Sequence, residues 1–199
     1  MPDIALPSMA ELALALALAW GAGIRVYLVL FCVGLAGRMG WTVLPDGMSI
    51  LSHPLVLGAS GFMLAVEFLA DKVPWIDSIW DAVHTFIRIP AGAALAAMVF
   101  NDGTAAMPVV AAILGGAVAA GSHFTKAGAR GAINASPEPF SNWAASFAED
   151  AAVPAGLWLA IVHPAVFLVL LAVGAVCAVL LLRWIVGGLR ALARRLRSR

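Results

Sequence analysis

Charged residues are scarce in this sequence: Asp, Glu, Lys and Arg make up 12% of its 199 residues, while 63% are hydrophobic. Water-soluble domains carry about 25% charged residues, so this composition excludes an ordinary soluble domain. Residues 164–182 contain no charge, and apolar runs of about 20 residues can cross a bilayer as helices. The runs lack the period-two alternation of barrel strands. We therefore predict an all-α membrane protein.

Cysteines and catalytic motifs are also scarce. Cys32 and Cys177 both lie in apolar segments, which is typical of packed hydrophobic residues and gives no support to a disulfide or a thiolate catalyst. The sequence has no glycine-rich phosphate loop, no HExxH zinc motif and no nucleophile elbow. Its four histidines are scattered. We expect no catalytic residue, no metal site and no cofactor, and hence a protein that is not an enzyme.

What the sequence does contain is a series of helix-length apolar segments. We predict a single membrane domain over residues 1–185, followed by a basic tail at 186–199. Six arginines and no acid lie between Arg183 and Arg199. About six transmembrane helices are expected, at residues 8–38, 54–72, 75–100, 105–125, 139–162 and from 164 onwards.

The arginine-rich tail predicts the orientation, because loops rich in Lys and Arg stay in the cytoplasm. Six spans then place both termini in the cytoplasm, with a bacterial inner (plasma) membrane as the expected location. Lys72, Lys126 and Arg130 are expected in inside loops. Beside the lipid bilayer, the tail has anionic lipid head groups as a second expected partner. It has no features of a nucleic-acid-binding surface.

An internal repeat divides the chain into three related helical hairpins. The stretch SIWDAVHTFIRIPAGAALA at residues 78–96 is similar to SNWAASFAEDAAVPAGLWLA at 141–160. Hairpins of two spans each point the same way, so the repeats are predicted to be parallel, at about residues 8–72, 75–126 and 137–185. The first helix of each hairpin is expected to be broken. The predicted breaks are at Gly21, Gly23, Pro90 and Pro154.

Polar stripes run along several of these segments. Asp77, Asp81, His84 and Arg88 follow at helical spacing and share one face. Charges inside membrane spans usually point into the bundle. They can form a static salt-bridge network, lie at the membrane interface, or line a hydrated pathway. The candidate pathway residues are Glu67, Asp71, Asp81, His84, Arg88, Lys126, Arg130, Asn142, Glu149 and Asp150.

Two stretches that carry these stripes also carry a family resemblance. FLADKVPWIDSIWDAVHTFIRIPAG and HFTKAGARGAINASPEPFSNWAASFAED resemble the signature stretches of the membrane family catalogued as domain-of-unknown-function family 4126. GIRVYL near the start fits as well. The resemblance covers nearly the whole chain and implies an integral membrane protein. It supplies no catalytic residues.

The functional hypothesis is a small transporter or channel for an ion or small polar solute. Arg88, Lys126 and Arg130 favour an anion, whereas the carboxylates favour a cation or a proton. One alternative is a membrane scaffold or assembly factor whose buried charges are paired and static. Another is a lipid-handling protein at the cytoplasmic interface. The pathway could lie within one six-helix bundle or require a homo-oligomer.

Overall fold

The computed structural model describes residues 7–100, 106–134 and 140–197, except for the side chains of 74–75, 181–182 and 184–197. This part of the chain is all-α, as predicted. A 3-10 helix that the sequence analysis did not anticipate, η1, precedes the second long helix. The elements are α1 (Met9–Arg38), η1 (Asp46–Ser52), α2 (Pro54–Ala70), α3 (Pro74–Met98), α4 (Ala106–Asn134), α5 (Phe140–Val162) and α6 (Pro164–Arg197).

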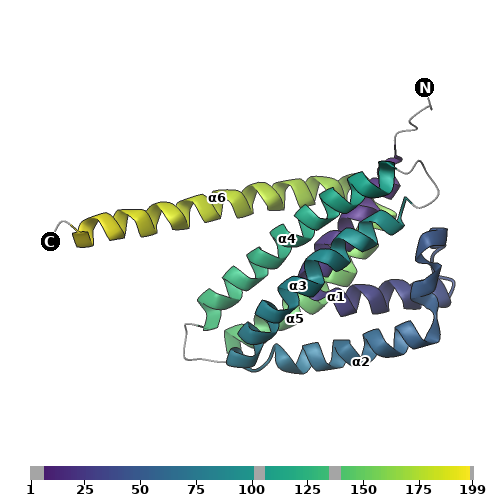
Figure 1. Ribbon diagram of the computed structural model, residues 1–199, viewed down its shortest axis with the longest axis horizontal. Coiled ribbons are helices and arrows are strands. Elements are labelled where there is room, and N and C mark those ends of the chain that lie inside the picture. The colour runs from purple at the N-terminus through teal and green to yellow at the C-terminus, as the bar shows by residue number, and fades with distance from the viewer. Residues whose placement is uncertain (1–6, 101–105, 135–139, 198–199) are drawn as a thin grey trace.

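Helix α1 lies at the centre of the fold and contacts every other helix. Its first half is rich in alanine and leucine on all sides, and such a helix is stable only when it is surrounded. Ser8 caps its start by accepting a hydrogen bond from the backbone of Glu11, whose carboxylate bonds back to Ser8. Figure 1 shows α3, α4 and α5 running alongside it as a bundle.

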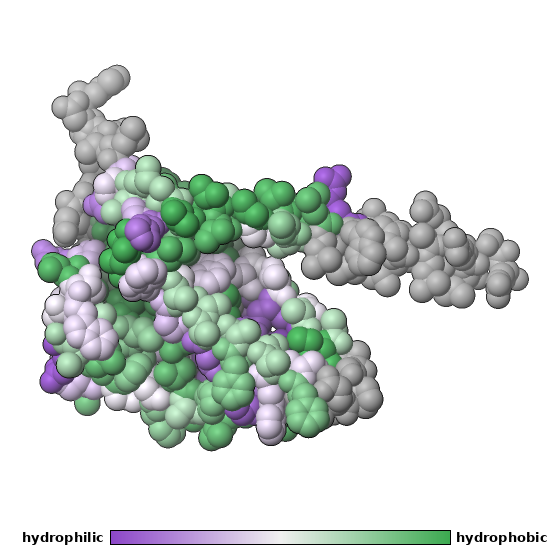
Figure 2. Space-filling model, turned by 180° about the vertical axis from the view of Figure 1, so that it is seen from behind, coloured by the Kyte–Doolittle hydropathy of each residue, from purple (hydrophilic) through white to green (hydrophobic). Residues whose placement is uncertain are grey.

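The remaining elements lie at the edges of this bundle. The second half of α1, η1 and α2 form a separate arm, which Figure 1 shows below and beside the bundle. Helix α6 starts beside α5 and then extends away from the other helices, carrying the C-terminus with it. On the face shown in Figure 2, α6 is almost wholly apolar up to the grey atoms.

The predicted helix breaks at Gly21 and Gly23 are wrong in position, and those at Pro90 and Pro154 are not breaks. The non-helical residue of α1 is Arg25, with φ −146° and ψ 84°, whereas Gly21 and Gly23 are helical. A side chain at Gly23 would collide with the backbone of α4 at Ala119. Glycine is therefore needed there for close packing rather than for a turn.

Helices α3 and α5 run without interruption through Pro90 and Pro154. A proline removes only one amide hydrogen bond and crowds the preceding turn. The remaining helical hydrogen bonds are enough to keep each helix continuous through its proline. Of the predicted breaks, only the one in α1 has a counterpart, and it lies two residues beyond Gly23.

Among the described residues, three helices are long and apolar enough to cross a membrane: α1, α4 and α5. The pair η1 and α2, bent by 66°, counts as a fourth candidate span. The predicted six spans and their arrangement as three repeated hairpins are not established by these helices. Helix α3 is not among these candidates, and the apolar stretch of α6 within the described side chains, Pro164–Leu180, is short.

Candidate functional site

Buried polar and apolar positions occupy opposite halves of the bundle. Along α4 the buried residues are apolar at Ala111 and Ala119, then polar from His123 to Arg130. In α5 they are polar at Asn142 and Ser146 and apolar beyond Val153. Helix α3 follows the same division, with buried polar residues from Asp77 to Arg88 and buried apolar residues at Leu95 and Ala96. The buried polar residues are Arg25, Ser60, Glu67, Asp71, Asp77, Asp81, His84, Arg88, His123, Lys126, Arg130, Asn142 and Ser146.

The break in α1 places Arg25 in the middle of this polar half. Its side chain is fully buried, and Nη2 lies 2.8 Å from Oδ2 of Asp71, the residue that ends α2. Nε lies 3.0 Å from Oδ1 of Asp150, and Nη2 also donates to the hydroxyl of Ser146 at 2.9 Å. Arg25 therefore joins α1 to α2 and α5.

Arg88 on α3 holds two carboxylates. Nη2 donates to Oε1 of Glu67 at 2.6 Å, and Nη1 donates to Oδ1 of Asp81 at 2.5 Å. Asp81 and Arg88 are seven residues apart on one helix, so they share a face, while Glu67 comes from α2. Charge-assisted bonds this short are among the strongest in proteins.

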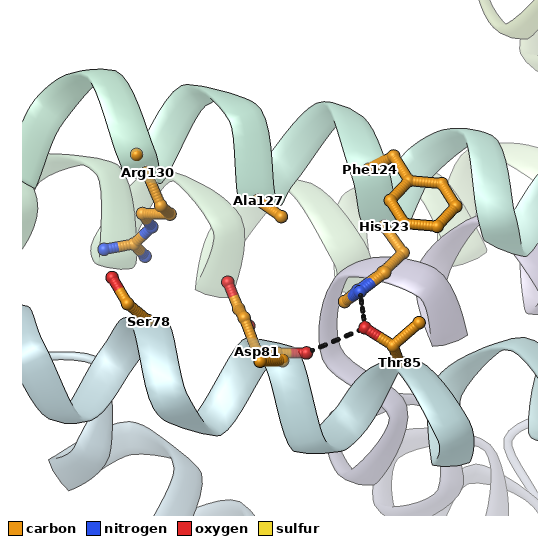
Figure 3. A pocket seen from close by; sticks show the side chains of 9 residues that line it. Ser78, Asp81, Thr85, His123, Phe124, Ala127 and Arg130 are labelled. Atoms are coloured by element: carbon orange, nitrogen blue, oxygen red, sulfur yellow. Dashed lines mark hydrogen bonds between the residues drawn. The ribbon is translucent and has the colours of Figure 1, made fainter.

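The hydrogen bonds of His123 define its neutral tautomer. Its Nδ1 lies 3.4 Å from Nη1 of Arg88, and a guanidinium can only donate, so Nδ1 is the acceptor. Nε2 therefore carries the hydrogen and donates to the hydroxyl of Thr85 at 2.7 Å. Thr85 in turn donates to the backbone carbonyl of Asp81 at 3.1 Å, as Figure 3 shows.

Arg130 fastens α4 to α5. Its Nε and Nη2 donate to the two oxygens of Glu149, at 3.1 and 2.9 Å, and Nη1 donates to the carbonyl and the side-chain oxygen of Asn142. The Asn142 amide reaches the carbonyl of Asp71 at 3.0 Å. A bidentate guanidinium–carboxylate pair of this kind fixes the orientation of the two side chains as well as the distance between them.

Lys126 lies between these three arginine-centred groups. Its Nζ is 3.2 Å from the carbonyl oxygen of Ile24, just before the break in α1. It is 3.3 Å from Oε2 of Glu149, 3.4 Å from Oδ2 of Asp71 and 3.5 Å from Oδ1 of Asp81. The ammonium is thus enclosed by one carbonyl and three carboxylates, which α1, α3, α5 and the end of α2 contribute.

His84 lies at the edge of this network. Its Nδ1 is 2.8 Å from the carbonyl of Trp80, so Nδ1 carries the hydrogen. Nε2 is 3.2 Å from the hydroxyl of Tyr27, and the ring stacks on Trp80 with centroids 4.2 Å apart.

Lys72 lies near the network but outside its ion pairs. Its ammonium is 3.0 Å from the centre of the Phe68 ring.

Carboxylates outnumber cations in the network. Four cations (Arg25, Arg88, Lys126 and Arg130) are within ion-pair distance of six carboxylates (Glu67, Asp71, Asp77, Asp81, Glu149 and Asp150). With every group ionised, six negative charges against four positive ones leave a surplus of two negative charges. Five of the six carboxylates also have one buried oxygen that receives no hydrogen bond from the described residues.

A groove between α3 and α4 leads to the network from outside. It has a volume of about 290 Å³, and its lining includes Asp81, Thr85, His123, Phe124 and Arg130. Figure 3 shows the side chains of Asp81, Thr85, His123 and Arg130 in the space between the two helices. Glu149 and Asp150 give a second approach, because their side chains are 17% and 23% exposed.

The family model for a domain of unknown function, DUF4126, matches residues 12–184. The chain belongs to the DUF4126 family. This confirms the resemblance identified from the two polar stretches. No curated protein and no solved structure matches the chain.

All ten predicted pathway residues of this DUF4126 protein lie in or beside one network. Nine are joined by ion pairs or hydrogen bonds, and His84 lies at the edge. The list of predicted pathway residues omitted Arg25, although a lone arginine in an apolar segment is a visible signal. It also omitted Asp77, which lies four residues before Asp81. Nothing in the sequence marked Tyr27 or Thr85.

The positions of Lys126 and Arg130 bear on the predicted orientation of the chain in the membrane. Lys126 and Arg130 lie inside α4, which extends to Asn134, and both side chains are buried. They were predicted as loop charges, and that assignment is wrong, because buried charges paired with carboxylates say nothing about which side of the membrane a loop occupies. Of the three predicted inside charges, only Lys72 lies between two helices.

Proposed function

We propose that this protein carries a cation through its buried charge network. The observation that supports this most directly is the surplus of carboxylates, together with their unpartnered oxygens. Within the described residues, Glu67, Asp71, Asp77, Asp81 and Asp150 each have a buried oxygen without a hydrogen-bond donor. Buried carboxylate oxygens are stabilised by protons or cations, since leaving them uncompensated carries a large desolvation cost.

The cationic side chains, by contrast, are engaged. Arg88 pairs with Glu67 and Asp81, and Arg130 donates to Glu149 through both Nε and Nη2. Two nitrogens of Arg25 and one of Arg88 lack hydrogen bonds to the described residues, but each guanidinium is already paired with two carboxylates. An incoming anion would have to displace these carboxylates, so the network favours a positive solute over the anion that the sequence also allowed.

The membrane setting of this proposal includes α3 as a span. Its charged residues face inward, while Ile79, Val83 and Phe86 are 66%, 56% and 83% exposed. A hydropathy average over all faces of a helix misses this arrangement, in which only the outer face meets lipid. With α3 and α6 included, the protein would have six membrane spans in a single membrane domain.

Orientation, location and further contacts belong to the same proposal. We propose that both termini lie in the cytoplasm of a bacterial cell, and the arginine-rich end of the chain supports this orientation. It also suits contact with anionic lipid head groups. The carrier performs no chemical reaction and uses no cofactor. Assembly into a homo-oligomer would cover part of the extended helix α6.

The division of the bundle into halves favours a carrier over an open channel. The charged half is reached through the α3–α4 groove and past Glu149 and Asp150. The other half is filled by apolar side chains, Leu18, Leu95 and Leu157 among them. A cation can therefore enter the network from one side, and the apolar half must rearrange before it leaves on the other.

Purified protein in liposomes tests this function. Proton, potassium and ammonium flux would be measured separately, with wild type compared with Asp71→Asn and with Asp46→Asn as a matched control. Asp46 is exposed on η1 and takes part in none of the ion pairs described above. We expect one of these cations to move faster than in empty liposomes, with flux lost in Asp71→Asn and retained in Asp46→Asn. Flux equal to that of empty liposomes for all three cations would refute the proposal.

A second candidate function is a static membrane scaffold. It is favoured by one specific observation: Arg25, Arg88 and Arg130 each link carboxylates from two different helices or helix ends. Labelling distinguishes the two functions. A cysteine at Glu149 reacts with a membrane-impermeant reagent if the network is hydrated, whereas a sealed scaffold protects it. The scaffold also predicts no cation flux.

A further inference from the structure

The most informative feature of the network is the position of Lys126. Its ammonium lies among four oxygens, the carbonyl of Ile24 and the carboxylates of Asp71, Asp81 and Glu149. We infer that these four oxygens form a binding site for a monovalent cation of ammonium size. In this structure the ammonium group of Lys126 occupies that site. This inference rests on the cation-carrying function proposed above and names the class of cation.

The site does not depend on Lys126 for its shape. Each of its three carboxylates is held by a different arginine: Asp71 by Arg25 at 2.8 Å, Asp81 by Arg88 at 2.5 Å and Glu149 by Arg130 at 2.9 Å. The Lys126 ammonium is 3.2–3.5 Å from its four oxygens, longer than the usual 2.7–2.9 Å or so of a charge-assisted bond. The arginines therefore fix the oxygens, and the lysine is the loosely held ion.

The fourth oxygen comes from the broken helix. The non-helical conformation of Arg25 ends the first half of α1 at Ile24. Carbonyls at the end of a helix lack their internal partners, and the helix dipole makes that end negative. A cation at this position is favoured for the same reason that broken helices bind cations in membrane transporters. The break in α1 is thus part of the site.

The size of the site selects among cations. Magnesium and calcium need oxygens at about 2.0–2.6 Å, far closer than these four. Within the described part of the chain, no group of three or more His, Cys, Asp or Glu side chains is placed to hold a metal ion. An ammonium ion bonds oxygens at about 2.7–3.2 Å, so an inward shift of a few tenths of an ångström accommodates it.

The site can also be reached from outside the bundle. A route exists, because Asp81 lines the α3–α4 groove and also faces the Lys126 ammonium.

Chemical rescue of a variant with a shortened side chain tests the site independently of transport. Lys126→Ala removes the ammonium and leaves the arginine-held oxygens without it. The melting temperature of the purified variant would be measured in about 100 mM ammonium chloride and in the same concentration of sodium or tetramethylammonium chloride. We expect ammonium to raise it by about 4 °C over sodium. Tetramethylammonium has the charge but no N–H donor, so it should not rescue.

Two control variants keep the result specific. Lys72→Ala removes a neighbouring lysine whose ammonium lies over the Phe68 ring, so ammonium should give that variant no selective stabilisation. Lys126→Met fills the space with an apolar chain, so ammonium should not stabilise it either. If Lys126→Ala does not fold in sodium buffer, the yield of folded protein in ammonium against sodium replaces the melting temperature as the readout.

The outcomes separate this inference from the proposed function. Ammonium-selective rescue of Lys126→Ala alone supports the site, even if wild-type liposomes carry no cation and the transport function fails. Absence of rescue overturns the site, and if wild-type liposomes still carry a cation, the transport function stands without it. Equal rescue by sodium and ammonium overturns the size selectivity, and with it the inference.

Discussion

The charge surplus of the network predicts an asymmetry between removing a cation and removing a carboxylate. Arg88→Met deletes the guanidinium that pairs with Glu67 and Asp81, both of which are buried. Glu67→Gln keeps a hydrogen-bond acceptor for Arg88 and leaves Asp81 as its counter-ion. Because carboxylates are in excess, the first change worsens the imbalance and the second reduces it.

The magnitudes differ accordingly. Removing one partner of a buried ion pair typically costs about 3–5 kcal/mol, because the remaining charge is left uncompensated. Arg88→Met leaves Glu67 in that state and leaves Asp81 with only the longer contact to Lys126 at 3.5 Å, so we expect the upper end of this range. Glu67→Gln weakens one charge-assisted hydrogen bond, which is worth about 1.5–3 kcal/mol, and the reduced repulsion offsets part of the loss.

The assay is thermal unfolding of the purified variants in detergent, followed by a fluorescence or aggregation signal. For a chain of this size, about 1 kcal/mol corresponds to a shift of about 2–4 °C. Arg88→Met should therefore melt about 10 °C or more below wild type, and Glu67→Gln only a few degrees below. Asp46→Asn, on the exposed η1 helix, should melt like wild type.

One result would refute the reasoning directly. If Glu67→Gln is destabilised as much as Arg88→Met, or more, then the network behaves as a balanced set of pairs. The carboxylate surplus would not act as a negative field, and the argument for a cation over an anion would lose its basis. A raised melting temperature in Arg88→Met would have the same consequence.

Three further predictions follow from individual contacts. Gly23→Ala should lower stability by about 1–3 kcal/mol, because a methyl group would collide with the backbone of α4, whereas Gly128→Ala, in open space, should be neutral by the same thermal assay. Tyr27→Phe should cost about 1 kcal/mol through loss of the hydrogen bond to His84, and an unchanged melting temperature would contradict that bond. Lys72→Gln should cost about 1 kcal/mol or less, the usual worth of a cation–π contact, and a larger loss would place Lys72 inside the ion-pair network.

Local sequence predicted the helices well, because helix formation depends on neighbouring residues. The start of α2 at Pro54 and the end of α5 at Val162 agree with the predicted boundaries. The shared face of Asp81 and Arg88 follows from helical geometry alone, and the structure confirms it with a direct ion pair. The 3-10 helix at Asp46–Ser52 was missed, since no periodic pattern marks it.

The sequence by itself determined that this is an apolar all-α chain whose charges lie in stripes. Only the tertiary structure decided that the stripes converge, that Pro90 leaves α3 continuous, and that the break in α1 falls at Arg25. The reason is that each of these depends on partners far away in the chain. Lys126 meets Asp71 across 55 residues and Ile24 across 102, and no local pattern specifies such pairings.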